Sequence, residues 1–195
     1  MEIEIIKEIK KFVEEECKKP SSKYGFEPFE FHFIPVVKYC RLLAESKNLN
    51  DEEKEICILS GWLHDIGSII YGRENHHITS SEIAESKLRG LGYSENKIER
   101  VKSAVYTHRG SQKMIPKFIE GKILQEADSM DSFDNLPGLF KAAFIYENLN
   151  QKQACSSILN KLERKFSQLS EEGKKFVEEK FKAIKFILIN HLEKE

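Results

Sequence analysis

The stretch ICILSGWLHDIG, residues 56–67, places a histidine and an aspartate side by side at the end of an apolar run. Asn50 and Glu53 precede it with the spacing of a capping box, so we expect a helix that begins there and reaches His64. Burying an imidazole and a carboxylate costs free energy unless another group compensates their charge and hydrogen-bonding demand. A divalent metal ion would compensate both, although such a pair alone is also typical of a hydrogen-bonded structural couple.

Helical periodicity extends outward from this stretch over almost the whole chain. An amphipathic helix is expected at 3–18, and a second helix should carry His32 and the apolar residues up to Ala44. Segment 66–75 has two glycines and no sustained period, which predicts a loop. Strand-like alternation is not convincing anywhere. Further helices are expected at 77–90, 95–108, 117–129, 136–149, 151–168 and 171–192.

The pattern predicts an all-α helical bundle in a single domain, residues 1–195, because this length does not demand a second core. Its motif-bearing core should span about 28–148, followed by a C-terminal helical hairpin at about 151–192. The hairpin carries a regular apolar stripe. That stripe is typical of packing against the core, and a homodimer surface is the alternative.

Composition limits the function classes. Hydrophobic residues make up 40% and charged residues 32% of the chain, as in soluble globular proteins. No apolar run approaches the roughly 18 residues of a membrane span, and the N-terminus resembles no targeting peptide, so no membrane partner and a cytoplasmic location are expected. The net charge of −1 argues against long nucleic acid as a partner. The four cysteines are scattered without a C-x-x-C pair, which favours small core residues.

Histidines and carboxylates also recur in a defined order around the His64–Asp65 pair. His32 lies on the preceding predicted helix, and Asp128 in LQEADSMD follows an apolar stretch that should turn it inward. Asp131, three residues later, is a candidate supporting carboxylate on a similar face. Imidazole and carboxylate are usual ligands of first-row divalent ions. Three helices are therefore expected to bring two histidines and two aspartates to one point.

This order, H…HD…D, resembles the HD superfamily of metal-dependent phosphohydrolases. The resemblance covers residues 31–132, in the words GWLHDIG, ENHHITSSEIAESKL, AVYTHRG and ILQEADSMDSFD. It implies an HD-type helical bundle and hydrolysis of a phosphate ester by metal-activated water, with His64 and Asp65 in catalytic roles. It also implies a set of ligands for one metal ion, namely His32, His64, Asp65 and Asp128.

Some branches of that superfamily bind a second metal through two further histidines. Aligning Ser80 with the small residue of the branch pattern selects His76, with His77 displaced by one position, and His108 in THRG would be the other. Each is a candidate for a second metal or for phosphate contact. Many relatives read HDIGK, where this chain has Ser68. Three other cations could supply the missing positive charge: Arg73, Arg109 or Lys113. The alternative for each of them is an ordinary solvated residue on the surface.

The leading hypothesis is a hydrolase of a small-molecule phosphate ester, with a nucleotide as the favoured substrate. The cofactor is expected to be one or two divalent metal ions, drawn from Mn, Fe, Co, Ni, Zn or Mg. One alternative is a two-metal phosphodiesterase of cyclic dinucleotides or oligonucleotides. Others are a non-catalytic regulatory module with the same fold, and more remotely a two-iron oxygenase.

Overall fold

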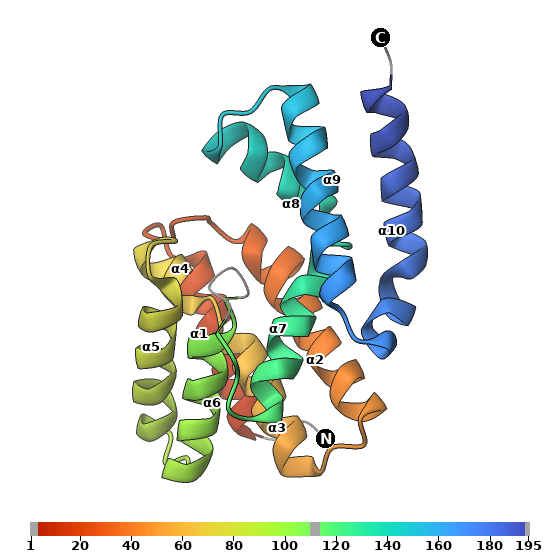
Figure 1. Ribbon diagram of the computed structural model, residues 1–195. Coiled ribbons are helices and arrows are strands. Elements are labelled where there is room, and N and C mark those ends of the chain that lie inside the picture. Colours follow the sequence, from red (N-terminus) through yellow and green to blue (C-terminus); the bar gives the residue numbers. More distant parts are fainter. Residues whose placement is uncertain (1–3, 110–113, 194–195) are drawn as a thin grey trace. The chain divides into compact units, whose positions relative to one another are not determined.

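Every regular element in residues 4–109 and 114–193, which this computed structural model describes, is a helix (Figure 1). The all-α prediction is therefore confirmed. Helices also explain how so polar a sequence builds a core, since each helix can bury one apolar stripe and expose its Lys and Glu residues. Within the same residues, no helix combines the length and the hydropathy that crossing a bilayer requires.

The chain divides into two compact units, Met1–Asp128 and Ser129–Glu195. The single-domain organisation stays a prediction. The first unit contains α1 (Glu4–Lys18), η1 (Phe29–Phe33), α2 (Ile34–Ser46), α3 (Asp51–Leu63), α4 (Ile66–Tyr71), α5 (His76–Gly90), α6 (Glu95–Thr107) and most of α7 (Ile119–Asp131). The second contains α8 (Leu136–Lys141), η3 (Ala142–Tyr146), α9 (Gln151–Gln168) and α10 (Glu171–Leu192). The η elements are short π-helices.

The core of the first unit is built around α3, which is buried along most of its length. Helices α1, α2 and α6 pack against α3, and α5 lies beside α6 (Figure 1). Gly61 permits the approach of α2, because a Cβ there would lie 3.1 Å from a methyl carbon of Val37. All four cysteines are free and buried, which confirms that they are core residues.

Helix α3 begins at the predicted capping box. The Asn50 side chain accepts the Glu53 backbone N–H at 2.9 Å, and the Glu53 carboxylate accepts the Asn50 N–H at 3.0 Å. Satisfying these otherwise unpaired amides fixes where the helix starts. The register of α3, which carries the His64–Asp65 pair at its other end, follows from this start.

Replacing Asn50 by alanine is expected to lower the free energy of unfolding by about 1 kcal/mol, because the N-cap acceptor is lost. Urea denaturation measures the change. Asn190→Ala, on the exposed side of α10, is the matched control and should be neutral or slightly stabilising, since alanine is the better helix former. Equal stabilities of Asn50→Ala and the parent protein would contradict this account of α3.

The predicted loop at 66–75 is wrong in its first half. Two residues, His64 and Asp65, interrupt the helical path, and α4 then begins at Ile66. The glycines weaken helix propensity, but α4 buries Ile66 and Ile69 and packs on α1 and α5. Packing therefore outweighs local preference here.

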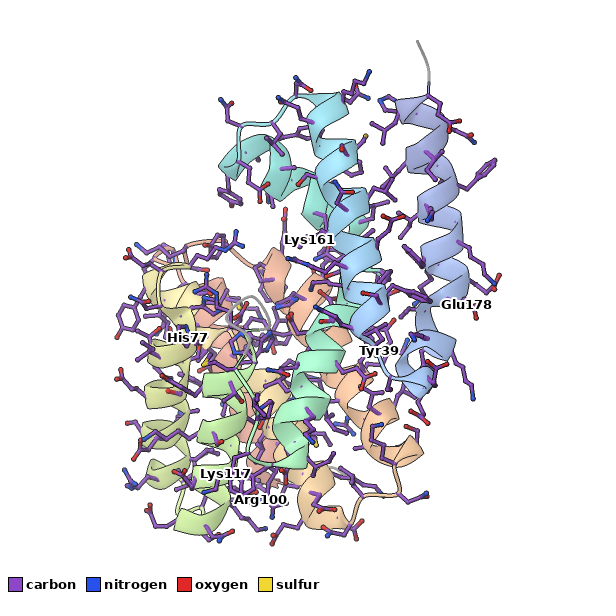
Figure 2. All side chains as sticks on the ribbon, in the orientation of Figure 1. Tyr39, His77, Arg100, Lys117, Lys161 and Glu178 are labelled. Atoms are coloured by element: carbon purple, nitrogen blue, oxygen red, sulfur yellow. The ribbon has the colours of Figure 1, made fainter. Side chains whose placement is uncertain are left out.

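Helix α7 is tied to α6 by a buried ion pair. Arg100 of α6 (Figure 2) binds Glu120 of α7, whose side chain is fully buried, and it also donates to Glu52 of α3 at 2.9 Å. An enclosed carboxylate requires such a partner. The pair fixes the first turn of the helix that carries Asp128 further along.

The second unit is organised by three aromatic rings. Phe166 of α9 and Phe181 of α10 stack with centroids 4.4 Å apart, and Phe133 meets Phe181 edge-on at 5.7 Å. Helices α9 and α10 run antiparallel, side by side (Figure 1). The predicted helix at 136–149 is instead α8 followed by η3. The homodimer surface on the hairpin stays a prediction.

Candidate metal centre

Four of the six histidines converge on the carboxylate of Asp65 in the first unit. Asp65 Oδ2 lies 3.5 Å from Nε2 of His32 and 4.0 Å from Nε2 of His64. The other oxygen, Oδ1, lies 3.2 Å from Nε2 of His76 and 3.3 Å from Nε2 of His108. His32, His64 and Asp65 form one group, and Asp65, His76 and His108 form another. In each group, one candidate ligand atom per residue lies within 4.8 Å of the other two. Asp65 is therefore shared by two groups that could each hold a metal ion.

Each ligand stands near the end of a helical element. His32 lies in η1, just before α2, while Asp65 occupies the break between α3 and α4 with φ −115° and ψ 13°. This is the sparsely populated bridge region of backbone space, common at active sites. His76 is the first residue of α5, after Asn75 in the left-handed conformation, and His108 directly follows α6. Converging helix ends thus assemble the cluster from residues far apart in sequence.

Hydrogen bonds to the backbone orient three of the rings. Nδ1 lies within hydrogen-bond distance of the carbonyl oxygen three residues earlier, at 2.8 Å in His64, 2.8 Å in His76 and 2.6 Å in His108. A carbonyl can only accept, so Nδ1 carries the proton in each ring. In the neutral rings, Nε2 then presents a lone pair toward Asp65. Metal-ligating histidines characteristically anchor their second nitrogen in this way.

The resulting arrangement has an excess of acceptors. Nε2 of His76 and Nε2 of His108 lie only 3.3 Å apart, although both nitrogens carry lone pairs in the neutral rings. Asp65 Oδ1, which faces both, is buried and has no partner in hydrogen-bond geometry among the residues that the structure describes. Burying acceptors without a donor is costly. A cation between these three atoms would satisfy all of them, so the donor set fits a metal ion.

At His64 and Asp65 the electrostatics also favour the protonation states that bind a metal. Burial lowers the pKa of His64 to about 4, so the ring is neutral at pH 7. Burial alone would raise the pKa of Asp65, but the surrounding histidines, His64 first, hold it well below its usual value. Burial also disfavours charge on His108, yet the neighbouring Asp65 carboxylate raises its pKa above the ordinary value. A neutral imidazole beside an ionised carboxylate is the form that binds metal.

The two remaining predicted carboxylates lie on α7. Asp128 Oδ1 lies 4.0 Å from Nε2 of His32, so the structure brings Asp128 to the His32 side of the cluster. Asp131 is buried and belongs to the second unit. Its supporting role stays a prediction.

The structure distinguishes His76 from His77. The His77 ring, near the start of α5, packs against Tyr106 with centroids 5.5 Å apart (Figure 2). Burial, followed by the neighbouring charges of His76 and Arg109, lowers the pKa of His77. Of these two neighbouring histidines, His76 is the one that lies beside Asp65.

The three candidate phosphate-binding cations differ in placement. Arg73 is exposed, and its backbone carbonyl anchors His76. Arg109 is half-buried and directly follows His108. Lys113 lies outside the described residues. Ser68, at the position of lysine in HDIGK, is buried. Phosphate contact by any of these cations stays a prediction.

Sequence reasoning used Ser80 only to select His76 and missed the contacts that bring α4 and α5 together. The Gly67 backbone N–H donates to Ser80 Oγ at 2.9 Å, and a Cβ on Gly67 would lie 2.2 Å from Thr79 Oγ1 and 2.9 Å from the His76 carbonyl oxygen. Glycine therefore permits the close approach that sets His76 beside Asp65. The available signal was a glycine two residues after the aspartate, followed by a small residue at Ser80.

Comparison with known proteins identifies related folds and a family. A protein from Lactobacillus plantarum has the same fold, with a TM-score of 0.70 and 13% identity over 98% of this chain and 97% of that one. A predicted HD superfamily hydrolase from an uncultured Thermotogales bacterium superposes with a TM-score of 0.55 and 21% identity, over 89% of this chain and 91% of that one. At these identities the two structures show the fold.

An uncharacterized protein from Clostridium beijerinckii is 35% identical over 82 residues, which cover 40% of this chain and 50% of that protein. The family model of the HD domain matches residues 30–132, and this span contains all the ligands of the Asp65 cluster. The match extends over more than half of the sequence, and the chain therefore belongs to the HD domain family.

Proposed function

We propose that the chain is a two-metal phosphohydrolase that cleaves a small-molecule phosphate ester, with a nucleotide as the favoured substrate class. The observation that carries this proposal is the position of the Asp65 carboxylate between two pairs of histidine nitrogens. One oxygen faces His32 and His64, and the other faces His76 and His108. Paired metal sites of this type recur in enzymes that displace groups at phosphorus.

In this proposal His32, His64, Asp65 and Asp128 hold the first ion, and His76 and His108 share Asp65 to hold the second. Bound divalent ions supply Lewis-acid charge to phosphoryl oxygens and lower the pKa of bound water toward neutrality. The ligands themselves are preoriented, because three of the rings are fixed by backbone hydrogen bonds.

Other residues of the chain would act on the substrate. Arg109 follows His108 directly, so its guanidinium is the cation best placed in sequence to contact a phosphate oxygen. Asp65 would orient the attacking water from its position between the two histidine pairs.

The net charge of −1 supports a small substrate over long nucleic acid. We expect the protein to act in the cytoplasm.

A phosphodiesterase is the second candidate, because its requirement for two metals is met by the same six ligands. Its favoured substrates would be cyclic dinucleotides or oligonucleotides. Comparing monoester with diester hydrolysis separates the two proposals directly.

The defining experiment is an assay of the purified protein with chromogenic phosphate monoesters and diesters, in the presence of Mn, Co, Ni or Mg. Metal-dependent release of the chromophore is expected, and a nucleotide panel then identifies the substrate class. Absence of hydrolysis of every ester with every metal, in protein that retains bound ions, would refute a phosphohydrolase.

The adjacent histidines of α5 should behave differently. His76→Ala is expected to retain one metal ion per chain and to lose the second, because one of the two lone pairs facing Asp65 Oδ1 disappears. His77→Ala is the matched control and should retain both ions, since His77 packs against Tyr106. Metal content after gel filtration measures the difference. Equal metal content in the two variants would contradict the assignment of His76.

A further inference from the structure

One face of α7 carries Gly121, Gln125 and Asp128 at helical spacing. At the first position, a Cβ would lie 2.6 Å from Pro116 Cβ and 3.3 Å from Thr107 Oγ1. Glycine therefore lets both ends of the α6–α7 connection pack onto the first turns of α7. Asp128, at the last position, is a candidate metal ligand.

Gln125 lies between these two positions and makes two hydrogen bonds with a single amide. Its Nε2 donates to the backbone carbonyl of Thr107 at 2.6 Å and to that of Met114 at 3.0 Å. An amide nitrogen has two hydrogens, so both are used. Thr107 is the last residue of α6, and Met114 lies within the connection that leads to α7. The amide thus holds the end of α6 and this part of the connection together, and ties both to α7.

The position of the buried His108 depends in part on how the end of α6 is held. Helix α6 ends at Thr107, so His108 is the first residue beyond the regular helix. Its ring is held by Nδ1–H donation to the Val105 carbonyl, and its backbone follows directly from Thr107. Thr107 is itself fixed through its hydroxyl, which donates to the Ser103 carbonyl at 2.8 Å. The Gln125 clamp adds hydrogen bonds that tie this helix end to α7.

We infer that Gln125 is a positioning residue that sets His108 against Asp65 and keeps it in register with Asp128. This inference rests on the proposed function, since it couples the ligand of one proposed ion to a ligand of the other. Gln125 lies one helical turn before Asp128, so a single helix supplies both a metal ligand and the clamp. Outer contacts that orient ligands are commonly worth about 10–100-fold in metal affinity.

The test is titration of metal-free protein with Mn²⁺, followed by calorimetry and by electron paramagnetic resonance of the bound ions. Gln125→Leu keeps the size of the side chain and removes both donors. Gln125→Glu keeps the shape and sets acceptors against the two carbonyls. Both variants are expected to weaken the second Mn²⁺ by at least about tenfold and to leave the first within about twofold. Gln168→Leu, on the exposed end of α9, is the matched control and should bind as the parent protein does.

A merely structural role is separated by combining Gln125→Leu with His108→Ala. If Gln125 acts through His108, the double variant binds Mn²⁺ as His108→Ala alone does. Further loss of the first ion in the double variant, or unchanged binding in both Gln125 variants while the parent holds two ions, would overturn the inference alone. A parent protein that binds a single Mn²⁺ would overturn the two-metal proposal and the clamp together.

Discussion

Asp65→Asn is expected to remove both metal ions and to lower phosphate-ester turnover by about 10³-fold, which corresponds to a loss of about 4 kcal/mol of transition-state stabilisation. Asparagine preserves the shape of the side chain but not the negative charge. Among the residues that the structure describes, this carboxylate is the candidate ligand shared by the two histidine groups. Its loss therefore affects both proposed ions, whereas loss of an outlying histidine affects one.

The measurement combines metal content after gel filtration with initial rates on a chromogenic ester, and circular dichroism verifies that helical content is retained. The matched control is Asp51→Asn, an exposed residue in the first turn of α3, which should keep both ions and full turnover. An Asp65→Asn protein that hydrolyses the ester at the parent rate would show that Asp65 has no part in the reaction.

Gly67→Ala is expected to destabilise the protein by about 3 kcal/mol, since overpacking of a tight interior typically costs about 1–3 kcal/mol and here involves backbone atoms. The new Cβ would lie 2.7 Å from the Ser80 amide nitrogen and 2.9 Å from the His76 carbonyl oxygen. Backbone atoms cannot move aside as the tip of a side chain can. Helix α5 must therefore shift away from α4, and His76 with it, so the second ion should also be lost.

Urea denaturation and Mn²⁺ titration measure these two effects together. Gly90→Ala is the matched control, because Gly90 lies at the end of α5 with nothing within 4 Å of a new Cβ. It should be neutral or stabilising. A Gly67→Ala protein with parental stability and two bound ions would mean that the close approach of α4 and α5 does not position His76.

The sequence predicted best those features that depend on residue types with few structural roles. A capping box fixes a helix start through local hydrogen bonds alone, so the beginning of α3 was predictable from Asn50 and Glu53. His64 and Asp65 could be chosen because a buried imidazole and carboxylate need compensation, and the H…HD…D order that resembles the HD superfamily added His32 and Asp128. The structure then brings these four residues to one cluster, with Asp65 at its centre.

The parts that sequence could not supply depend on contacts between distant segments. Helix α4 forms because its apolar residues are buried against α1 and α5, although two glycines flank and interrupt them. His76 and His77 are neighbours of identical chemistry, and successive residues of a helix point about 100° apart. Which of them faces Asp65 is set by the packing of α5 on Gly67. The Gln125 clamp likewise joins carbonyl groups, which carry no sequence signature.

We propose that the Asp65 carboxylate binds two metal ions at once. Crystals grown with Mn²⁺ and measured at the manganese absorption edge test it most directly, because each ion gives its own anomalous peak. Two peaks are expected about 3.5–4 Å apart, one beside each oxygen of Asp65. A single peak, or two peaks of which neither contacts Asp65, would contradict it.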